Sequence, residues 1–275
     1  MTAQPASRDL RAYLERIACS PDDASAPSLE LLAALHQAHL LAVPFENLSI
    51  HYGQPIILRE AALYDKIVHR RRGGFCYELN GLLAWLLRQH GFTVDLLSAE
   101  VAEVAEVAED GGSFSPPFDH LTLLVRGLED ADWLADVGFG DSFRHPLRLL
   151  ADSEQDGADG YTYRLRAPEA SRDEQAYWVM ERRHAPPDSA WEPQYRFTLR
   201  PHTLPDFELR CNYQQTSPES HFTQRRICSL ALPDGRLSLS DLRLITTING
   251  QREERLLASE QEYQATLVER FGVSL

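Results

Sequence analysis

One cysteine at the start of a strongly patterned helix constrains the fold of this chain more than any other feature. Leucines recur with the i, i+3, i+4, i+7, i+8 spacing of one helical face, at positions 79, 82, 83, 86 and 87. This pattern predicts a helix from about Cys76 to His90, which Gly91 is placed to end in the left-handed conformation. The helix begins at the cysteine itself, so the thiol lies at its amino end.

A thiol in this position can become nucleophilic. We expect Gly73 and Gly74 to turn the backbone sharply before the helix, whose unpaired N–H groups and positive dipole end favour a thiolate at Cys76. The alternative is an inert cysteine, because Cys76 precedes Leu79 by three residues on the same apolar face. The glycine pair and the polar neighbours of the thiol favour the nucleophile.

Length and composition limit the number of domains and the kinds of partner. The chain has 275 residues and 43% hydrophobic content, which is enough for a large domain or for two to three small ones. Its 41 acidic and 27 basic residues give a formal net charge of −14, and such a field repels nucleic acid. We therefore expect no nucleic-acid partner.

The cysteines and histidines indicate a reduced protein without a metal site. The four cysteines show no paired spacing, and the N-terminus has no apolar run of signal-peptide or membrane-spanning length. His36 and His39 have no nearby cysteine and form no HExxH pattern, so we expect no zinc. The expectation is a cytoplasmic protein with no membrane association.

Helical patterns come first along the chain, strand patterns second and a mixed region last. Ser7 and Ser28 are expected to cap two helices, and residues 59–69 form a third. The final helix is expected to begin at Ser259 with a capping box to Glu262 and to end at Gly272. Strands are expected at residues 92–99, 120–126, 132–137, 161–165, 176–180, 195–199, 207–213 and 226–232, then to about 247. This order predicts an α+β fold with an antiparallel barrel or sandwich.

Glu46 is a carboxylate in an apolar stretch. Such a group usually needs a partner when it is buried, and the candidate is Arg72, which lies just before the helix predicted to begin at Cys76. The alternative is a solvated loop glutamate. The pairing predicts structural support for the helix start.

His120 and Asp136 are the best candidates for a base and its orienting group. His120 opens the apolar strand HLTLLV after a Pro-Pro loop, so its side chain can lie at the rim of a sheet. Asp136 lies in the apolar segment WLADVGFG, where an unpaired carboxylate is expensive to bury, and an imidazole N–H would satisfy it. A cysteine at a helix start, a histidine at a strand start and a carboxylate on the next strand are the arrangement of papain-like and transglutaminase-like enzymes.

Gly138, Phe139 and Gly140 follow the carboxylate directly. A lone GxG without a following helix does not support a Rossmann nucleotide site. Two glycines at a strand end could let backbone N–H groups approach a phosphate or an oxyanion. A plain tight turn is the equally weighted alternative.

Together these segments resemble the arylamine N-acetyltransferase family. The resemblance is carried, in order along almost the whole chain, by VPFENLSIHYG (43–53), RGGFCYELN (72–80), DHLTLLV (119–125), ADVGFGD (135–141) and NYQQTSPESHF (212–222). It implies a helical domain over residues 1–91, a β-barrel domain over 92–200 and an α/β lid over 201–275. The first two would form a cysteine-protease-like core.

The resemblance also implies a reaction. Cys76, His120 and Asp136 would form a triad that takes acetyl from acetyl-coenzyme A. The acetyl group would pass to an arylamine, arylhydrazine or N-hydroxyarylamine, as in xenobiotic metabolism, with no permanently bound cofactor. Coenzyme contacts would fall at Thr122, at Gly138, Phe139 and Gly140, and at Tyr213.

Several residues depart from the family pattern, and other activities share the triad. The departures, which bear on coenzyme affinity and on the choice of acyl donor, are Glu100, Glu103, Glu106, Asp119, Glu219 and His221. A thiol hydrolase would use water as acceptor, and an amide synthase would join or close acyl chains. A binding protein with an inert Cys76 is the third alternative.

Overall fold

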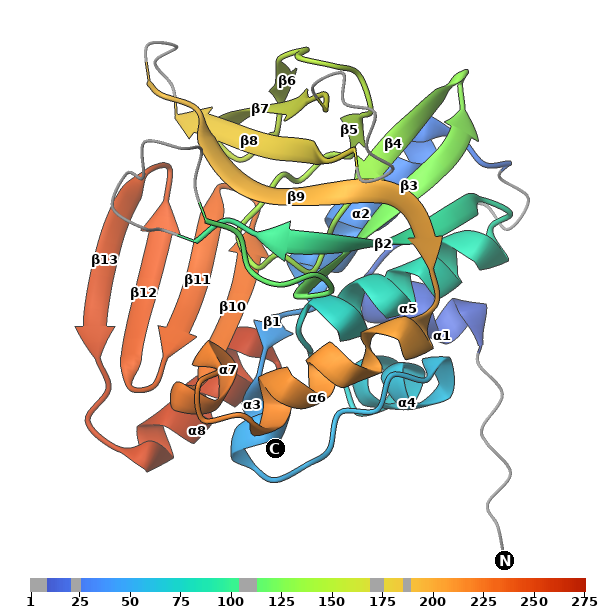
Figure 1. Cartoon of the computed structure of the whole chain (residues 1–275). Helices are drawn as coiled ribbons and strands as arrows, with labels where there is room; N and C mark the ends of the chain where they lie inside the picture. The colour runs from blue at the N-terminus through green and yellow to red at the C-terminus, as the bar shows by residue number, and fades with distance from the viewer. Residues whose placement is uncertain (1–8, 21–25, 104–112, 169–175, 185–188) are drawn as a thin grey trace, which may run out of the picture.

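Helix α5 (Cys76–Gln89) lies at the centre of the molecule, packed beneath strands β2 (Thr93–Val101) and β3 (His120–Leu128) (Figure 1). The computed structural model describes residues 9–20, 26–103, 113–168, 176–184 and 189–275. All five leucines of the predicted apolar face are completely buried. His90 caps the helix, and Gly91 follows with φ +84°. The predicted central helix is confirmed to within one residue.

The other elements before β2 are mostly short helices. They are α1 (Leu10–Arg16), α2 (Leu29–Ala42), α3 (Leu48–His51), α4 (Glu60–Tyr64) with its π-helical continuation η1 (Asp65–His69), and the short strand β1 (Phe45–Glu46). Ser28 caps α2 as expected, because its hydroxyl accepts a hydrogen bond from Leu31 N at 3.1 Å. The expected cap at Ser7 is wrong. The helix begins later, and the Asp9 carboxylate caps it by accepting from Arg11 N at 2.9 Å.

The predicted antiparallel barrel is confirmed as a nearly closed eight-stranded sheet in the order β5-β4-β3-β2-β9-β8-β7-β6. Its further strands are β4 (Ala131–Ala135), β5 (Leu147–Arg148), β6 (Gln155–Asp156), β7 (Tyr161–Arg166), β8 (Trp178–His184) and β9 (Glu192–His202). Side chains such as Leu124, Phe143 and Tyr195 fill the interior, while the opposite face of β2 and β3 packs on α5. The acidic repeat after Val101 falls largely in 104–112, outside the described residues.

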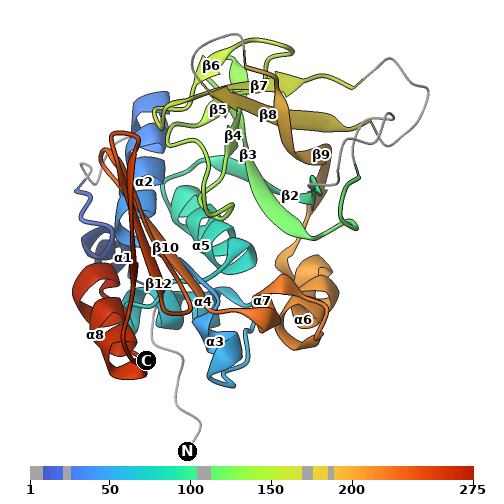
Figure 2. The same cartoon turned by 90° about the vertical axis from the view of Figure 1, so that its left-hand side faces the viewer.

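The remaining residues form a second sheet with helices. They comprise η2 (Leu204–Phe207), α6 (Glu208–Thr216), α7 (His221–Gln224), β10 (Ile227–Leu232), β11 (Gly235–Ser240), β12 (Arg243–Ile248), β13 (Gln251–Leu256) and α8 (Glu260–Phe271). The strand order β1-β10-β11-β12-β13 places β1, from the helical part of the chain, at the edge of this sheet. Figure 2 shows the sheet close to edge-on, with α8 beside its lower end. The α+β class is confirmed.

The strand expected at residues 207–213 is wrong, because this segment is helical. Phe207, Cys211 and Gln214 are buried at a spacing of four and three residues, whereas Leu209 is 85% exposed. The apparent alternation of apolar residues was therefore coincidental. The final helix is as expected at both ends: Ser259 Oγ accepts from Glu262 N at 3.2 Å, and Gly272 has φ +67°.

Candidate active site

Cys76 is the first residue of α5, and the backbone just before it is closely packed against its neighbours. A Cβ at Gly73 would lie 2.0 Å from Pro44 O, and one at Gly74 would lie 2.7 Å from the Glu78 side chain. The expected sharp turn at the two glycines is wrong, since neither has a positive φ and Arg71 takes φ +52° instead. The absence of a side chain allows Gly73 to pack closely against Pro44 and Gly74 to pack closely against Glu78.

Strand β1 and a glutamate fix this approach. Glu46 N donates to Gly74 O at 2.8 Å, and Gly74 N donates to Pro44 O at 3.3 Å. Glu78, in the first turn of α5, accepts from Phe75 N at 3.2 Å and so satisfies an otherwise free N–H at the helix start. The thiol therefore lies on a rigid part of the backbone.

His120 and Asp136 form a short buried pair. His120 Nε2 lies 2.6 Å from Asp136 Oδ2, and both residues are at most 2% exposed. The other carboxylate oxygen accepts from Asn80 Nδ2 and from Gly138 N, each at 2.9 Å. Burial alone would raise the pKa of Asp136, but the His120 charge and these hydrogen bonds outweigh it and lower the pKa.

The residues on either side of His120 contact the helix that carries the thiol. Cys76 Sγ lies 4.0 Å from the carbonyl of Asp119, which precedes His120. Asn80, one turn after the thiol, donates to the carbonyl of Leu121 at 2.6 Å. Since Asp136 occupies Nε2, Nδ1 is the ring nitrogen that remains for another partner.

Gly138 has a specific steric role at this site. A Cβ there would lie 2.7 Å from both Cys76 Cα and Asn80 Nδ2, so the strand end can approach α5 only as glycine. Val137 N also donates to Asn80 Oδ1 at 2.9 Å. Asn80 thus joins the helix carrying the thiol to the segment carrying Asp136, a role that its sequence position did not reveal.

Burial opposes a thiolate at Cys76. Cys76 is 4% exposed, and burial raises the pKa of its thiol well above the ordinary value, with the Asp119 and Asp136 carboxylates adding to the rise. The positive end of α5 acts in the opposite direction and favours the thiolate.

Aromatic rings lie beside His120, and others gather near the residue that precedes Cys76. Phe139 and Tyr195 lie 5.2 and 5.1 Å from the His120 ring between centroids. Phe222 lies 6.2 Å from Phe45 and 5.4 Å from Phe75. Only Phe139 could be singled out from the sequence. Phe45, Phe75 and Phe222 lie in segments that carry the family resemblance, but local sequence does not show that these segments meet.

The other two expected coenzyme contacts are Thr122 and Tyr213. Thr122 is fully buried, with its hydroxyl 3.4 Å from Tyr195 OH and 3.5 Å from Ala135 O, so its side chain faces the protein interior. Tyr213 lies on α6 under the Arg210 guanidinium, beside a groove of about 590 Å³ that Pro116, Pro117 and Phe118 also line.

The predicted partners Glu46 and Arg72 meet within a larger buried network. Arg72 Nε donates to Glu46 Oε1 at 3.1 Å, and Nη2 lies 2.9 Å from the same oxygen in a poorly aligned contact. Leu48 N donates to the second oxygen at 2.6 Å. Lys66, which the sequence did not single out, lies 3.9 Å from Glu46 and 2.8 Å from Glu78. Two cations thus offset two carboxylates.

The acidic departures from the family pattern are partly neutralised. Glu100, only 4% exposed, accepts from Arg196 Nε at 2.7 Å and from Tyr177 OH at 2.6 Å. Asp119 accepts from Arg210 Nε at 2.6 Å and from Gln214. These carboxylates add less negative field near the site than the sequence alone indicates.

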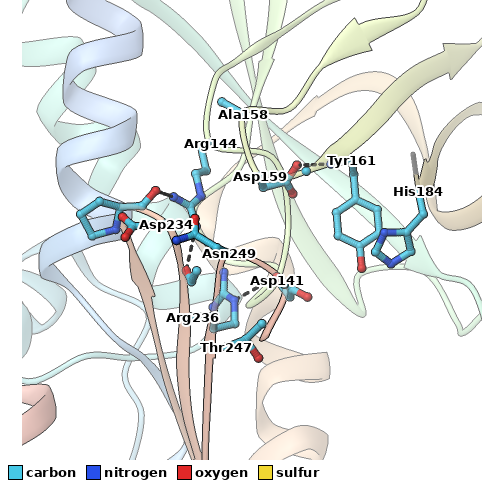
Figure 3. Close-up of a pocket in the computed structure, with 14 residues that line it drawn as sticks. Asp141, Arg144, Ala158, Asp159, Tyr161, His184, Asp234, Arg236, Thr247 and Asn249 are labelled. Carbon is cyan, nitrogen blue, oxygen red and sulfur yellow. Dashed lines mark hydrogen bonds and ion pairs between the residues drawn. The ribbon is translucent and has the colours of Figure 1, made fainter. Parts of the chain in front are cut away.

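A second groove, of about 600 Å³, begins just after Gly140 and separates the barrel from the turns of the C-terminal sheet (Figure 3). Its lining carries Arg144 and Arg236 together with the carboxylates of Asp141, Asp159 and Asp234. Arg236 already donates to Asp141 at 2.9 Å. Carboxylates outnumber the guanidinium groups, so this groove is not a simple anion site.

The part of the chain that the structure describes contains no group of three or more His, Cys, Asp or Glu side chains able to hold a metal ion. In those same residues, no helix is long and apolar enough to cross a bilayer. All four cysteines are free.

The family model described as N-acetyltransferase matches residues 28–275. The chain is 34% identical to the pineal gland arylamine N-acetyltransferase isozyme NAT-3 of Gallus gallus, covering 97% of this chain and 94% of that one. It is 36% identical to the arylamine N-acetyltransferase / N-hydroxyarylamine O-acetyltransferase of Salmonella typhimurium, covering 90% and 82%. The Mycobacterium marinum arylamine N-acetyltransferase in complex with CoA superposes with a TM-score of 0.81 at 32% identity, over 96% of this chain and 93% of that one. The chain therefore belongs to the arylamine N-acetyltransferase family and is an acyltransferase.

Proposed function

We propose that this enzyme transfers acetyl from acetyl-coenzyme A to arylamines, arylhydrazines or N-hydroxyarylamines through an acetyl thioester on Cys76. The buried 2.6 Å contact between His120 Nε2 and Asp136 carries the proposal, because it leaves Nδ1 to serve the thiol at the start of α5. The family supports the reaction class, and the CoA complex of the M. marinum relative supports the donor.

In the first half-reaction, His120 Nδ1 already holds the proton of the Cys76 thiol, and the thiolate forms a bond to the acetyl carbonyl carbon. The carbon–sulfur bond to the coenzyme then breaks, and the imidazolium returns the proton to the departing thiolate. In the second half-reaction, the amine nitrogen attacks the thioester while His120 accepts its proton. The Cys76 sulfur leaves as the thiolate while that proton stays on His120, so each cycle restores the ion pair.

Asp136 has two roles in this scheme. Its contact with Nε2 fixes the tautomer in which Nδ1 is free to accept a proton, and its charge stabilises the imidazolium. We infer that the resting site is a thiolate–imidazolium pair, in which the cation offsets the burial that raises the pKa of Cys76. The carboxylate is held by Asn80 and Gly138, so the imidazole cannot rotate freely.

The surroundings suit an aromatic acceptor. Phe139 lies against His120, and Phe45 and Phe222 lie at the approach to α5, where an aryl ring could stack on them. The proposed coenzyme contacts are the backbone at Phe139 and Gly140, together with Tyr213. The Thr122 side chain is buried and Gly138 N is already engaged with Asp136, so the proposal includes neither.

A discharge experiment tests the proposed acceptor. The acetylated protein, freed of coenzyme, is mixed with an arylamine or with buffer alone, and amide product and residual thioester are followed. We expect the arylamine to discharge the thioester far faster than water and to form one amide per thioester. Discharge at the same rate in buffer would identify a thiol hydrolase, and discharge only by an amine that is part of an acyl chain would identify an amide synthase. We also propose that the protein is a cytoplasmic enzyme of xenobiotic metabolism, since its cysteines are free and disulfides are rare in the cytosol.

A further inference from the structure

His36 lies on α2, far from the triad in sequence, yet its ring reaches the main chain of Asp136. The ring is fully buried and stacks on Phe143, with centroids 5.7 Å apart. Nδ1 lies 2.9 Å from Arg144 O, and Nε2 lies 3.1 Å from Asp136 N and 3.2 Å from Asp136 O. One imidazole thus bridges two segments of the barrel domain.

The need for this bridge follows from where β4 ends. Strand β4 ends at Ala135, which pairs with Leu123 of β3, so Asp136 is the first residue after the strand. Asp136 is completely buried, so its backbone N–H must find a partner other than water. His36 Nε2 is that partner.

The contacts also fix the protonation of the ring. With the proton on Nδ1, His36 donates to Arg144 O and accepts from Asp136 N–H, so both buried bonds are made. With the proton on Nε2, Nδ1 would face the Arg144 carbonyl without a hydrogen, and the Asp136 N–H would lose its acceptor. Burial also lowers the pKa of His36 to about 4, which keeps the ring neutral.

We infer that His36 is a positioning residue for the reaction: as the neutral Nδ1–H tautomer, it anchors the Asp136 main chain and so sets the carboxylate that orients His120. This inference rests on the proposed function of the triad. Asn80 and Gly138 hold the carboxylate of Asp136 from one side, and His36 holds its backbone from the other.

The hydrogen bonds that begin at His36 extend to the wall of the second groove. Arg144, whose carbonyl accepts from His36, donates through Nη1 to Pro233 O and through Nη2 to Gly235 O at 2.5 and 2.7 Å. Figure 3 shows this guanidinium beside the turn between β10 and β11. His36 therefore holds Asp136 in register with a segment that is itself tied to the C-terminal sheet.

Two amide substitutions separate positioning from packing, because each keeps one of the two hydrogen bonds. In His36→Gln, Oε1 can replace Nε2 as acceptor for Asp136 N–H, and the donor to Arg144 is lost. In His36→Asn, Nδ2 can replace Nδ1 as donor to Arg144 O, and Asp136 N–H is left without a partner. The acetylation rate of Cys76 is measured in a pre-steady-state burst with an activated aryl ester, beside melting temperature.

We expect His36→Gln to keep the burst within a few-fold of wild type and His36→Asn to slow it by about 10- to 100-fold, the scale of a misplaced catalytic group. Their melting temperatures should fall by similar amounts, since each loses one buried bond. Equal burst rates in the two variants, or rates that simply follow their melting temperatures, would overturn the positioning role. The wild-type burst is the internal control: its absence would count against the proposed function rather than against His36.

A measurement on the unaltered enzyme stands even where a variant fails to fold. Nitrogen-15 NMR of histidine-labelled wild-type protein at neutral pH distinguishes protonated from bare ring nitrogens. We expect His36, assigned by comparison with either variant or by contacts to Phe143, to carry its proton on Nδ1. A proton on Nε2 would contradict the inference directly.

Discussion

Removing the charge of Glu46 is expected to destabilise the fold, because its carboxylate is completely buried among charged partners. Arg72, 2% exposed, donates to it at 3.1 Å, and Lys66 lies 3.9 Å away. In Glu46→Gln, Lys66 would keep its 2.8 Å contact with Glu78, and Arg72 would lose the carboxylate that it contacts. Breaking one partner out of a buried pair costs about 3 to 5 kcal/mol, since the other charge is left uncompensated.

The assay is thermal and urea unfolding at pH 7 of wild type and Glu46→Gln. A loss of about 3 to 5 kcal/mol corresponds to a drop in melting temperature of roughly 6 to 20 °C for a chain of this size. The matched control is Glu254→Gln, which removes a carboxylate 3.1 Å from Arg243 in a pair that is 59% and 41% exposed. Such surface pairs contribute about 0 to 1 kcal/mol.

A double variant separates the lost charge from the lost packing. Adding Arg72→Met to Glu46→Gln removes the uncompensated cation, so we expect it to recover part of the stability lost in the single variant. If Glu46→Gln melts within the range of the surface control, the buried network does not stabilise the helix start and the reasoning is refuted.

The same carboxylate predicts a pH dependence. Burial acts to raise the pKa of Glu46, but Lys66 and Arg72 outweigh it, and the pKa lies below the ordinary value of 4.5. A lowered pKa contributes stability above pH 4.5 that is lost as pH falls through the folded-state pKa. The stability difference between wild type and Glu46→Gln should therefore narrow in acid. A difference that stays constant from pH 7 down to acid unfolding would argue against this.

Three predictions concern the triad. Asp136→Asn should keep its circular dichroism and lose about 100- to 10,000-fold in the acetylation burst, because the amide cannot stabilise the imidazolium; a near-normal burst would make Asp136 only structural. Iodoacetamide should label Cys76 faster than the buried Cys211 and Cys228 below pH 8, and His120→Gln should move that labelling to higher pH, since burial then raises the thiol pKa unopposed. Equal labelling of the three thiols would indicate an inert cysteine. Initial rates should give parallel double-reciprocal lines, as double displacement requires, whereas intersecting lines would indicate direct transfer.

The sequence predicted the elements whose patterns are local and strong. The leucine face of α5 and the caps at Ser28 and Ser259 are set by neighbours within four residues, so they could be read directly. The segment at 207–213 failed because its alternating apolar residues fit both a strand and a helix, and only tertiary packing buries Phe207 and Cys211 while exposing Leu209. Strand β13 was not expected because QREERL is exposed throughout and shows no alternation.

The residues of the candidate site also differ in whether the sequence could predict them. Cys76, His120 and Asp136 could be named because each lies at an element boundary with chemistry that needs a partner. Asn80 and His36 could not, because their roles come from contacts to backbone atoms 41 to 108 residues away, which leave no mark in a single sequence. Lys66 was hidden for a similar reason, since a lysine in a short helix ordinarily indicates a solvated surface.

The most direct test of the proposed mechanism is the intact mass of the protein after brief incubation with acetyl-coenzyme A, followed by peptide mapping. We predict that the mass rises by one acetyl group, that the group maps to Cys76, and that added arylamine removes it as the amide forms. Cys76→Ser should show no such adduct. Amide formation without any adduct, or an adduct that maps to another residue and still supports turnover, would contradict the thioester mechanism.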